Sequence, residues 1–277
     1  MKRVAIVTGA SSGIGRAAAI LLAARGFAVY GAARRAGRLA KLERFGVKPL
    51  PLDVTDEAAC HRAVNRVAAR EGRVDVLVNC AGYGSFGAVE DVPPDEALRQ
   101  FEVNVLGTAR MSRLCLPRMR RSGGRIINIS SVAATVCVPF AGLYFASKSA
   151  VEGLSGCLRQ ETAPFGVRVV TIRPGLIRTN FWKTASAKLE NASARGAYGS
   201  PARTAAATWR KQAMSGRLMS RPRDIALAIL YAAAVPKPPA IVTVGALVRL
   251  MPAMRAVLGD RAFDRMARFA LTSGLLK

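Results

Sequence analysis

The feature that most constrains the fold is a glycine-rich turn near the start of the chain. Residues 4–7 form a short apolar run that predicts a buried parallel strand. The turn that follows has the sequence TGASSGIG (residues 8–15), and it leads into a predicted helix over residues 16–25. Its glycines let the chain turn tightly and let a phosphate approach the backbone, and the helix start offers free N–H groups. This order predicts the opening unit of a nucleotide-binding fold, although a glycine turn alone can be only a tight connection.

The rest of the chain alternates strand-like and helix-like runs. Further strands are predicted at residues 27–33, 47–52, 74–78, 125–129, 167–172 and 240–244, and further helices at residues 56–71, 94–119, 144–163 and 222–234. Such alternation predicts an α/β fold with a doubly wound, seven-stranded parallel sheet and helices on both faces, a Rossmann fold.

The length favours one domain. The chain has 277 residues, 51% of them hydrophobic, and shows no repeat, low-complexity tract or long linker. We therefore expect one domain over residues 1–277, or at most two small ones.

Two segments depart from the alternation. Residues 180–221 are rich in Ala, Ser, Arg and Gly and carry Phe181, Trp182, Tyr198 and Trp209, which predicts a substrate lid with helical pieces. Residues 246–277 place apolar side chains at helical spacing between arginines. They predict a helical tail that packs on the core or on another subunit, or else a basic amphipathic segment that rests on a membrane.

The residue inventory argues against several classes of site. The five cysteines are spread out with no Cys-x-x-Cys, and His61 is the only histidine, so we expect no metal site and no disulfide framework. A mechanism based on histidine would depend on His61, which lies among arginines in a predicted helix and fits a surface position. No run of about 18 uncharged apolar residues exists, and the first apolar run is too brief for a signal peptide. A cytoplasmic protein in a reducing compartment is expected.

The net charge of +25 is large. It could reflect a general bias towards arginine, contact with an anionic membrane surface, or nucleic-acid binding. The basic residues are scattered and no nucleic-acid motif accompanies them, so we rank the bias first, peripheral membrane contact second, and expect no specific nucleic acid.

The end of the second predicted strand bears on the choice of cofactor. NAD-binding folds usually carry a carboxylate there for the ribose 2′-hydroxyl. This chain has Arg34 and Arg35 instead, and two guanidiniums can clasp a 2′-phosphate. NADP(H) is therefore favoured over NAD(H), which stays possible because both arginines could simply begin a solvated helix.

The next two strand ends also carry candidate cofactor contacts. Asp53 and Val54 follow the third strand, where Asp53 could bind the adenine amine. The fourth strand leads into Asn79-Cys80-Ala81-Gly82, whose small residues allow a ribose to approach closely, although Asn79 could instead tie two strands together.

Tyr144 and Lys148 lie four residues apart on a predicted helix, so both side chains leave the same face. An ammonium beside a phenol favours the phenolate and should lower the pKa of the tyrosine. A lowering by ~3 units requires about 4 kcal/mol. The result would be an acid and base usable near neutral pH, though the spacing alone is common. Asn104 lies within the apolar face of the helix over residues 94–119, where it could make a structural hydrogen bond or kink the helix and hold water.

Together these residues resemble the short-chain dehydrogenase/reductase family over residues 4–244. The resemblance depends on the glycine turn, Asp53, the run from Asn79 to Gly82, Asn104, Ser131, Tyr144 with Lys148, and Pro174-Gly175 with Thr179. Cys80 departs from the asparagine usual in the family. The segment from Arg221 onward resembles, more loosely, the branch that acts on hydroxysteroids and retinol-like alcohols.

The resemblance implies roles for these residues. Tyr144 would be the general acid/base, Lys148 would lower its pKa and bind the nicotinamide ribose, Ser131 would bind the substrate oxygen with Ser130 in support, and Asn104 would hold a relay water. The implied cofactor contacts are Gly9, Ser11, Ser12, Gly13, Ile14, Gly15, Arg34, Arg35, Asp53, Val54, Asn79, Ala81, Gly82, Tyr144, Lys148, Pro174, Gly175, Ile177 and Thr179.

The implied activity is NADP(H)-dependent hydride transfer between nicotinamide and a secondary alcohol or carbonyl of a lipophilic, steroid-, retinoid- or ketone-like substrate. NAD(H) dependence and a non-catalytic nucleotide sensor are the alternatives. The resemblance also implies a homodimer or homotetramer, formed through the helices that hold Asn104 and Tyr144.

Overall fold

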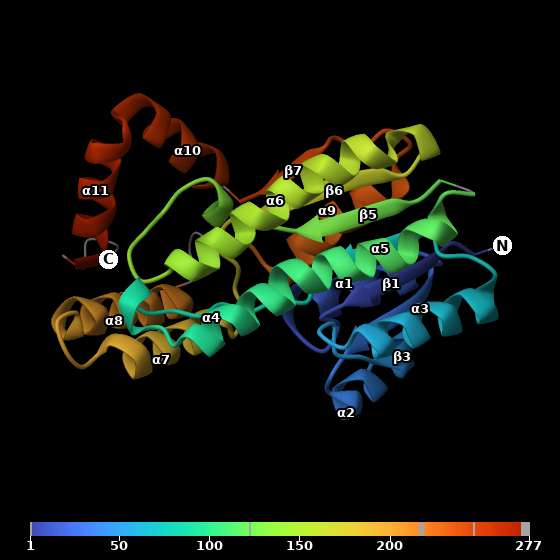
Figure 1. Ribbon diagram of the computed structural model, residues 1–277, viewed down its shortest axis with the longest axis horizontal. Coiled ribbons are helices and arrows are strands. Elements are labelled where there is room, and N and C mark those ends of the chain that lie inside the picture. Colours follow the sequence, from blue (N-terminus) through green and yellow to red (C-terminus); the bar gives the residue numbers. More distant parts are fainter. Residues whose placement is uncertain (1, 122, 216–218, 246, 273–277) are drawn as a thin grey trace.

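The computed structural model describes residues 2–121, 123–215, 219–245 and 247–272 (Figure 1). Its centre is a parallel sheet of seven strands in the order β3-β2-β1-β4-β5-β6-β7. The strands are β1 (Val4–Thr8), β2 (Ala28–Ala33), β3 (Val47–Pro51), β4 (Val76–Asn79), β5 (Arg125–Ile129), β6 (Arg168–Pro174) and β7 (Ile241–Val244). The order reverses direction between β1 and β4, as in doubly wound folds. The predicted fold class is confirmed.

Helices cover both faces of the sheet. On one face lie α1 (Gly13–Ala24) and α9 (Pro222–Ala234), and on the other lie α3 (Glu57–Glu71), α5 (Gly107–Met119) and α6 (Gly142–Thr162). β1 shows why two layers form, because Ala5 and Val7 face the first core while Val4 and Ile6 face the second. A strand with apolar side chains on both faces has to be covered on both.

The predicted helix over residues 94–119 is interrupted. It consists of α4 (Pro94–Phe101), a π-helical segment (Glu102–Leu106) and α5. Asn104 lies in the π-helical segment, where the helical hydrogen-bonding pattern changes locally. A short helix, α2 (Ala36–Ala40), begins directly after Arg35. The single-turn 3-10 segments are Glu43–Phe45, Val89–Asp91, Val132–Ala134 and Ala163–Phe165.

Four helices gather at the end of the molecule farthest from the N-terminus (Figure 1). They are α7 (Phe181–Ser193), α8 (Gly199–Ser215), α10 (Leu247–Leu258) and α11 (Asp260–Thr272). α7 packs on α8, and α11 packs on both α8 and α10. Residues 216–218 of the predicted lid, and residues 246 and 273–277 of the predicted tail, lie outside the described residues.

The tail helices pack on the core, as one of the two predictions for them states. Phe263 and Ala267 of α11 are buried against Val136, which lies in the connection between β5 and α6. Arg255 of α10 donates to the carbonyl of Thr135 in the same connection, at 3.2 Å. The tail therefore supports the segment that leads to Tyr144. Within the described part of the chain, no helix is long and apolar enough to cross a membrane.

Candidate active site

The carboxyl edge of the sheet gathers residues that lie far apart in the sequence. All seven strands run the same way, so the turns that follow them meet at one edge. This edge holds the glycine turn after β1, Arg34 and Arg35 after β2, Asp53 after β3, Gly82 after β4, Ser131 after β5 and Gly175 after β6.

The glycine turn is locked to the end of β4. A side chain at Gly9 would meet the carbonyl oxygen of Cys80 at 2.6 Å. The hydroxyl of Thr8 accepts the N–H groups of Cys80 and Ala81, each at 3.0 Å. A side chain at Gly15 would meet the carbonyl oxygen of Gly9 at 2.6 Å. Only glycine permits these approaches, so the turn holds a fixed shape.

The start of α1 is open to an anion. Ser12 precedes the helix but makes no side-chain capping bond to it, and the first turn holds no acid. Ile14 and Gly15 follow Gly13 in that first turn, where backbone N–H groups have no partner within the helix. A Cβ at Gly13 would lie 3.6 Å from the Cγ2 of Thr179, so the segment after β6 lies beside this turn.

The two arginines after β2 lie beside the glycine turn and the Asp53 loop. Arg35 donates to the hydroxyl of Ser11 at 2.9 Å and to that of Ser12 at 3.4 Å. Arg34 lies 3.9 Å from Asp53 in an exposed ion pair of little energetic weight. Uncapped helical N–H groups and two guanidiniums therefore form a cradle that fits the diphosphate of a dinucleotide and a further phosphate.

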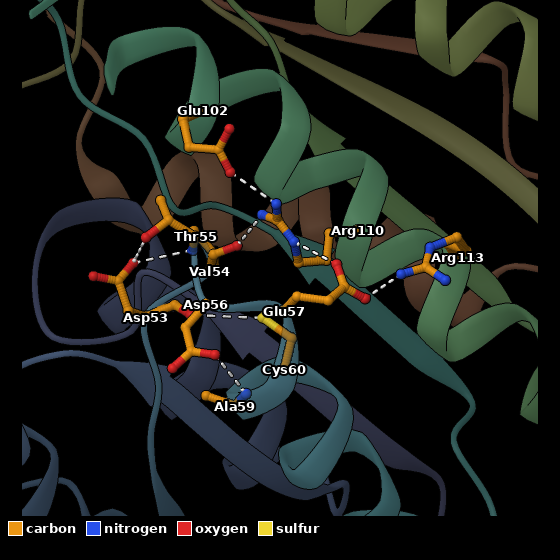
Figure 2. Close-up of polar contacts among 10 residues, drawn as sticks. All are labelled: Asp53, Val54, Thr55, Asp56, Glu57, Ala59, Cys60, Glu102, Arg110 and Arg113. Carbon is orange, nitrogen blue, oxygen red and sulfur yellow. Dashed lines mark hydrogen bonds and ion pairs between the residues drawn. The ribbon is translucent and has the colours of Figure 1, made fainter. Parts of the chain in front are cut away.

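The loop after β3 is anchored by Arg110 of α5 (Figure 2). Arg110 donates to the carbonyl of Val54 at 2.5 Å, to Glu57 at 2.8 Å and to Glu102 at 2.7 Å. Its side chain is only 14% exposed. Arg113 reaches Glu57 from the exposed side of the same helix. Arg110 thus connects the Asp53 loop, the start of α3 and the π-helical segment that holds Asn104.

Asn79 is buried within the sheet. Its amide donates to the side chains of Asn128 at 2.9 Å and Ser112 at 3.1 Å. These contacts join β4 to β5 and α5, which favours the structural alternative for this residue over a cofactor contact.

Asn104 connects three elements near Lys148. Its amide donates to the carbonyl of Tyr83 at 2.9 Å and to the hydroxyl of Ser147 at 3.0 Å, and its oxygen accepts the N–H of Tyr83 at 3.0 Å. A Cβ at Gly82 would lie 3.1 Å from Asn104 Oδ1 and 3.8 Å from Lys148 Nζ. The side chain of Asn104 is thus committed to fixing this corner, and the relay water stays a prediction.

The two serines after β5 point to different partners. Ser131 lies beside the phenol of Tyr144, whose pKa it lowers, and its hydroxyl accepts the N–H of Ala133 at 3.1 Å. Ser130 donates to Glu152 at 2.8 Å, and Glu152 forms an ion pair with Arg173. The geometry therefore favours Ser131 as the serine that meets a substrate, with Ser130 in a supporting network.

Tyr144 and Lys148 lie close together, but the protein's own atoms do not lower the pKa of the tyrosine. Lys148 Nζ lies 5.9 Å from the ring centroid of Tyr144 and donates to the carbonyl of Ile129 at 2.8 Å. Burial raises the pKa of Tyr144 to about 12, and the hydrogen bond with Ser131 offsets only part of this. Burial also lowers the pKa of Lys148 to about 8. The expectation of a lowered tyrosine pKa is wrong for the protein alone, because desolvation of the phenolate outweighs the effect of Ser131.

An aromatic cluster covers the other side of Tyr144, and we call it the aromatic wall. It consists of Phe86, Phe181, Trp182 and Trp209. Ring centroids of Phe86 and Phe181 lie 5.7 and 5.4 Å from that of Tyr144, and Trp209 lies 5.4 Å from Phe86. Phe86 was not predicted from the sequence, where its position shortly after β4 is the one feature that points to the site. Nor was a role predicted for Ser147, which lies one helical turn from Tyr144.

The family model for short chain dehydrogenases matches residues 3–190 of this chain. The match includes β1 to β6, the glycine turn, Ser131, Tyr144 and Lys148. The chain belongs to the short-chain dehydrogenase family. It is accordingly an oxidoreductase, and the sequence-based resemblance is confirmed.

Curated short-chain dehydrogenases cover part of the chain. It is 41% identical over 182 residues to a probable short-chain type dehydrogenase/reductase of Helicobacter pylori, covering 65% of this chain and 67% of the relative. It is 39% identical over 181 residues to the 3-ketodihydrosphingosine reductase of Bacteroides thetaiotaomicron, covering 65% of each chain. The matched part thus spans about two thirds of these relatives.

Solved structures of short-chain dehydrogenases cover nearly the whole chain. An enzyme from Burkholderia cenocepacia in complex with NADP has a TM-score of 0.73 and 27% identity, covering 98% of this chain and 97% of that one. An enzyme from Burkholderia phymatum in complex with NAD has a TM-score of 0.77 and 26% identity, covering 93% and 92%.

Proposed function

We propose that this short-chain dehydrogenase is an NADP(H)-dependent oxidoreductase that interconverts a secondary alcohol and a carbonyl in a lipophilic, steroid-, retinoid- or ketone-like substrate. The observation that carries the proposal is the position of Tyr144. Its phenol lies beside Ser131, its ring borders the aromatic wall, and both residues lie at the sheet edge that holds the glycine turn.

The residues divide the chemistry between them. The bound nicotinamide supplies or accepts the hydride. In reduction, Tyr144 donates its proton to the substrate oxygen, which Ser131 also contacts. The pKa of about 12 keeps the phenol protonated at neutral pH, which is the state that reduction needs. Lys148 supplies a positive charge and, beside its bond to the carbonyl of Ile129, two further N–H donors for the tyrosine and the ribose. Asn104 fixes the corner that lies against Lys148.

The cradle favours NADP(H). Arg34 and Arg35 lie beside Ser11, Ser12 and Asp53, and a 2′-phosphate would meet two guanidiniums there. The remaining proposed contacts of the cofactor are Asp53 and Val54 at the adenine, Ala81 and Gly82 at the ribose, and Pro174, Gly175, Ile177 and Thr179 at the carboxamide. Dependence on NAD(H) is the alternative, and Arg34→Asp tests the role of Arg34 in the choice. It should raise the KM for NADPH far more than that for NADH, and an unchanged ratio of the two would mean that Arg34 does not select the cofactor.

The aromatic wall favours a lipophilic substrate. Phe86 and Trp209 are buried, and Phe181 borders both Tyr144 and Phe86. The relative from B. thetaiotaomicron is named for 3-ketodihydrosphingosine, which fits the same class. In this proposal residues 180–221 act as a lid, because α7 contributes Phe181 and Trp182 and α8 contributes Trp209 to the wall.

The test of the mechanism is Tyr144→Phe. We expect this variant to lose NADPH oxidation with all ketones by at least ~100-fold, because general acid catalysis contributes about 10²–10⁴-fold. Its affinity for NADPH, measured by fluorescence titration, should stay within about threefold of wild type. Turnover at the wild-type rate would contradict the proposed role. A complete screen of ketones and aldehydes without NADPH or NADH oxidation by the wild type would instead favour a non-catalytic nucleotide sensor.

Two partner proposals accompany this function. We place a homodimer or homotetramer interface on the helices that hold Asn104 and Tyr144, and analytical ultracentrifugation tests it. We also place peripheral contact of a cytoplasmic protein with an anionic membrane on α10, where Leu250, Val257 and Leu258 are exposed beside basic residues. Sedimentation with anionic vesicles should fall for the double variant Val257→Asp/Leu258→Asp. Unchanged sedimentation would exclude this surface.

A further inference from the structure

Four arginines mark the edge of the sheet opposite the candidate active site. Arg3 precedes β1, Arg73 precedes β4, and Arg125 and Arg168 are the first residues of β5 and β6. They lie far apart in the sequence, but the sheet order β1-β4-β5-β6 makes these four strand starts consecutive neighbours. The scattered basic residues of the sequence therefore include a cluster that only the topology reveals.

The four side chains line a pocket of about 360 Å³. Its other lining residues are Asp75, Pro236 and the glycines Gly123, Gly124 and Gly166. Gly123 and Gly166 have left-handed backbones, and a Cβ at Gly123 would meet the carbonyl oxygen of Gly166 at 3.2 Å. Among the described residues the two loops thus meet through the backbone of Gly123 and Gly166, beside the four arginines.

The positive charge of this pocket is not balanced by its own residues. Asp75 is the one carboxylate among the lining residues that the structure describes. It is bonded to Arg73 at 2.6–3.0 Å, and its Oδ2 also accepts the N–H of Val4 at 2.7 Å. Asp75 thus offsets Arg73, and the charges of Arg3, Arg125 and Arg168 remain in excess.

Arg125 shows most clearly how the excess positive charge destabilises this part of the fold. It is the direct register partner of Arg168 across β5 and β6, and like charges in that position destabilise a sheet. Its terminal nitrogen donates to the carbonyls of Val235 at 3.2 Å and Pro236 at 3.0 Å, while its Nε is buried without a partner. Burial, Arg3 and Arg168 together lower the pKa of Arg125. Such a conflict between local charge and stability is typical of a functional site.

We propose that this pocket binds a small anion with two or more phosphate oxygens, separately from the nicotinamide site. Planar guanidiniums bind phosphate oxygens in pairs, and several of them around one space select multiply charged groups. Binding there would offset the repulsion between Arg125 and Arg168. The phosphate can belong to a free phosphorylated compound or to a phospholipid headgroup, and both present the same oxygens.

The test uses the holoenzyme saturated with NADPH, so that the cradle at the glycine turn is filled, and titrates it with inorganic pyrophosphate by calorimetry. The test variant is Arg168→Gln, since Arg168 is exposed. The matched control is Arg66→Gln, which removes one exposed arginine on α3. We expect saturable binding to wild type and to the control, and binding weaker by about tenfold or more in Arg168→Gln, because a charge-assisted contact is lost. Equal binding by all three proteins would overturn the proposal.

Thermal unfolding gives a second readout, because loss of Arg168 should affect the unfolding temperature in opposite directions without and with pyrophosphate. Without pyrophosphate, Arg168→Gln should unfold at the same temperature as wild type or higher, because the like-charge pair is gone. With pyrophosphate, wild type should gain more than this variant. If Arg168→Gln is less stable without the anion, Arg3→Gln replaces it in both assays, and retention of full pyrophosphate binding by Arg3→Gln would overturn the proposal.

A vesicle sedimentation experiment distinguishes a phospholipid headgroup from a free phosphorylated compound as the source of the phosphate. Vesicles that contain phosphatidic acid are sedimented with wild type and Arg168→Gln, with and without pyrophosphate. Sedimentation that needs Arg168 and is displaced by pyrophosphate would assign a lipid headgroup. Pyrophosphate binding that needs Arg168, without such sedimentation, would assign a free phosphorylated compound.

Discussion

Lys148 shows how burial sets the chemistry of a single residue. Its side chain is 7% exposed, and burial lowers its pKa from 10.5 to about 8. This difference corresponds to about 3 kcal/mol by which the buried charge destabilises the folded state. The cost is fully present below pH 8, where the lysine is charged in both states. It declines between pH 8 and about 10.5, where only the unfolded chain still holds the proton.

Replacement of this lysine should therefore trade activity for stability. We expect Lys148→Met to raise the free energy of unfolding at pH 7 by about 2 kcal/mol, after about 1 kcal/mol is lost with the bond to Ile129. The gain should shrink as the pH rises from 8 to 10.5, while activity is lost throughout. Urea unfolding at several pH values measures this, with the exposed Lys41→Met as the control. A gain that does not change over this range would contradict the pKa of Lys148.

Individual residues also show the limits of sequence reasoning. Tyr144, Lys148 and Ser131 could be placed together from spacing and resemblance, and the structure brings them together. The pKa of Tyr144 could not be predicted, because its direction depends on how deeply the tertiary structure buries the phenol. Phe86 joins that wall from the turn after β4, and no periodicity in the sequence marks it.

Among the elements, the π-helical segment and the Asp53 loop are joined through Arg110. We expect Arg110→Met to raise the KM for the cofactor about tenfold and to lower the free energy of unfolding by about 2–4 kcal/mol, because Glu102 and the carbonyl of Val54 lose their partner. Arg113→Met is the matched control, since Arg113 shares Glu57 but is 65% exposed. Steady-state kinetics and urea unfolding test both variants. Similar KM values for the two would show that Arg110 does not position the loop.

The packing of α11 against the segment before Tyr144 gives a second prediction at the level of helices and loops. Phe263 is 1% exposed, so Phe263→Ala should cost about 3–5 kcal/mol of unfolding free energy. It should also lower kcat while NADPH affinity is kept, since the segment over residues 132–141 loses its support. The control is Phe269→Ala on the same helix, where the side chain is 59% exposed and we expect a change below about 1 kcal/mol. Equal kcat values for both variants would separate the tail from catalysis.

Strands and helices were predicted well where apolar periodicity and flanking glycines mark their ends within a short stretch of sequence. All seven strands were expected within two residues of their observed ends, because each is a short apolar run. The helix over residues 94–119 was expected as one piece, because a π turn leaves the apolar periodicity nearly unchanged. The tail was expected to be helical, but its partner depends on contacts between α11 and Val136 that lie over a hundred residues apart.

For the whole molecule, charge is the dominant feature. There are 42 lysines and arginines against 17 aspartates and glutamates. Such an excess repels itself in the compact state, and the topology concentrates part of it at the starts of β1, β4, β5 and β6. Composition predicted the excess, whereas its placement requires the sheet order. The self-repulsion should be visible in how stability responds to salt.

We expect the unfolding temperature to rise with potassium chloride between about 0.01 and 0.15 M, because the screening length falls from ~30 to ~8 Å. A gain of about 1 kcal/mol corresponds to roughly 2–4 °C for a chain of this size. Differential scanning calorimetry at constant pH measures it. The control is the double variant Arg62→Glu/Arg66→Glu on the exposed side of α3, which lowers the net charge by four and should show a smaller rise. An equal rise in both proteins would mean that chloride stabilises the fold in some way other than screening of the overall charge.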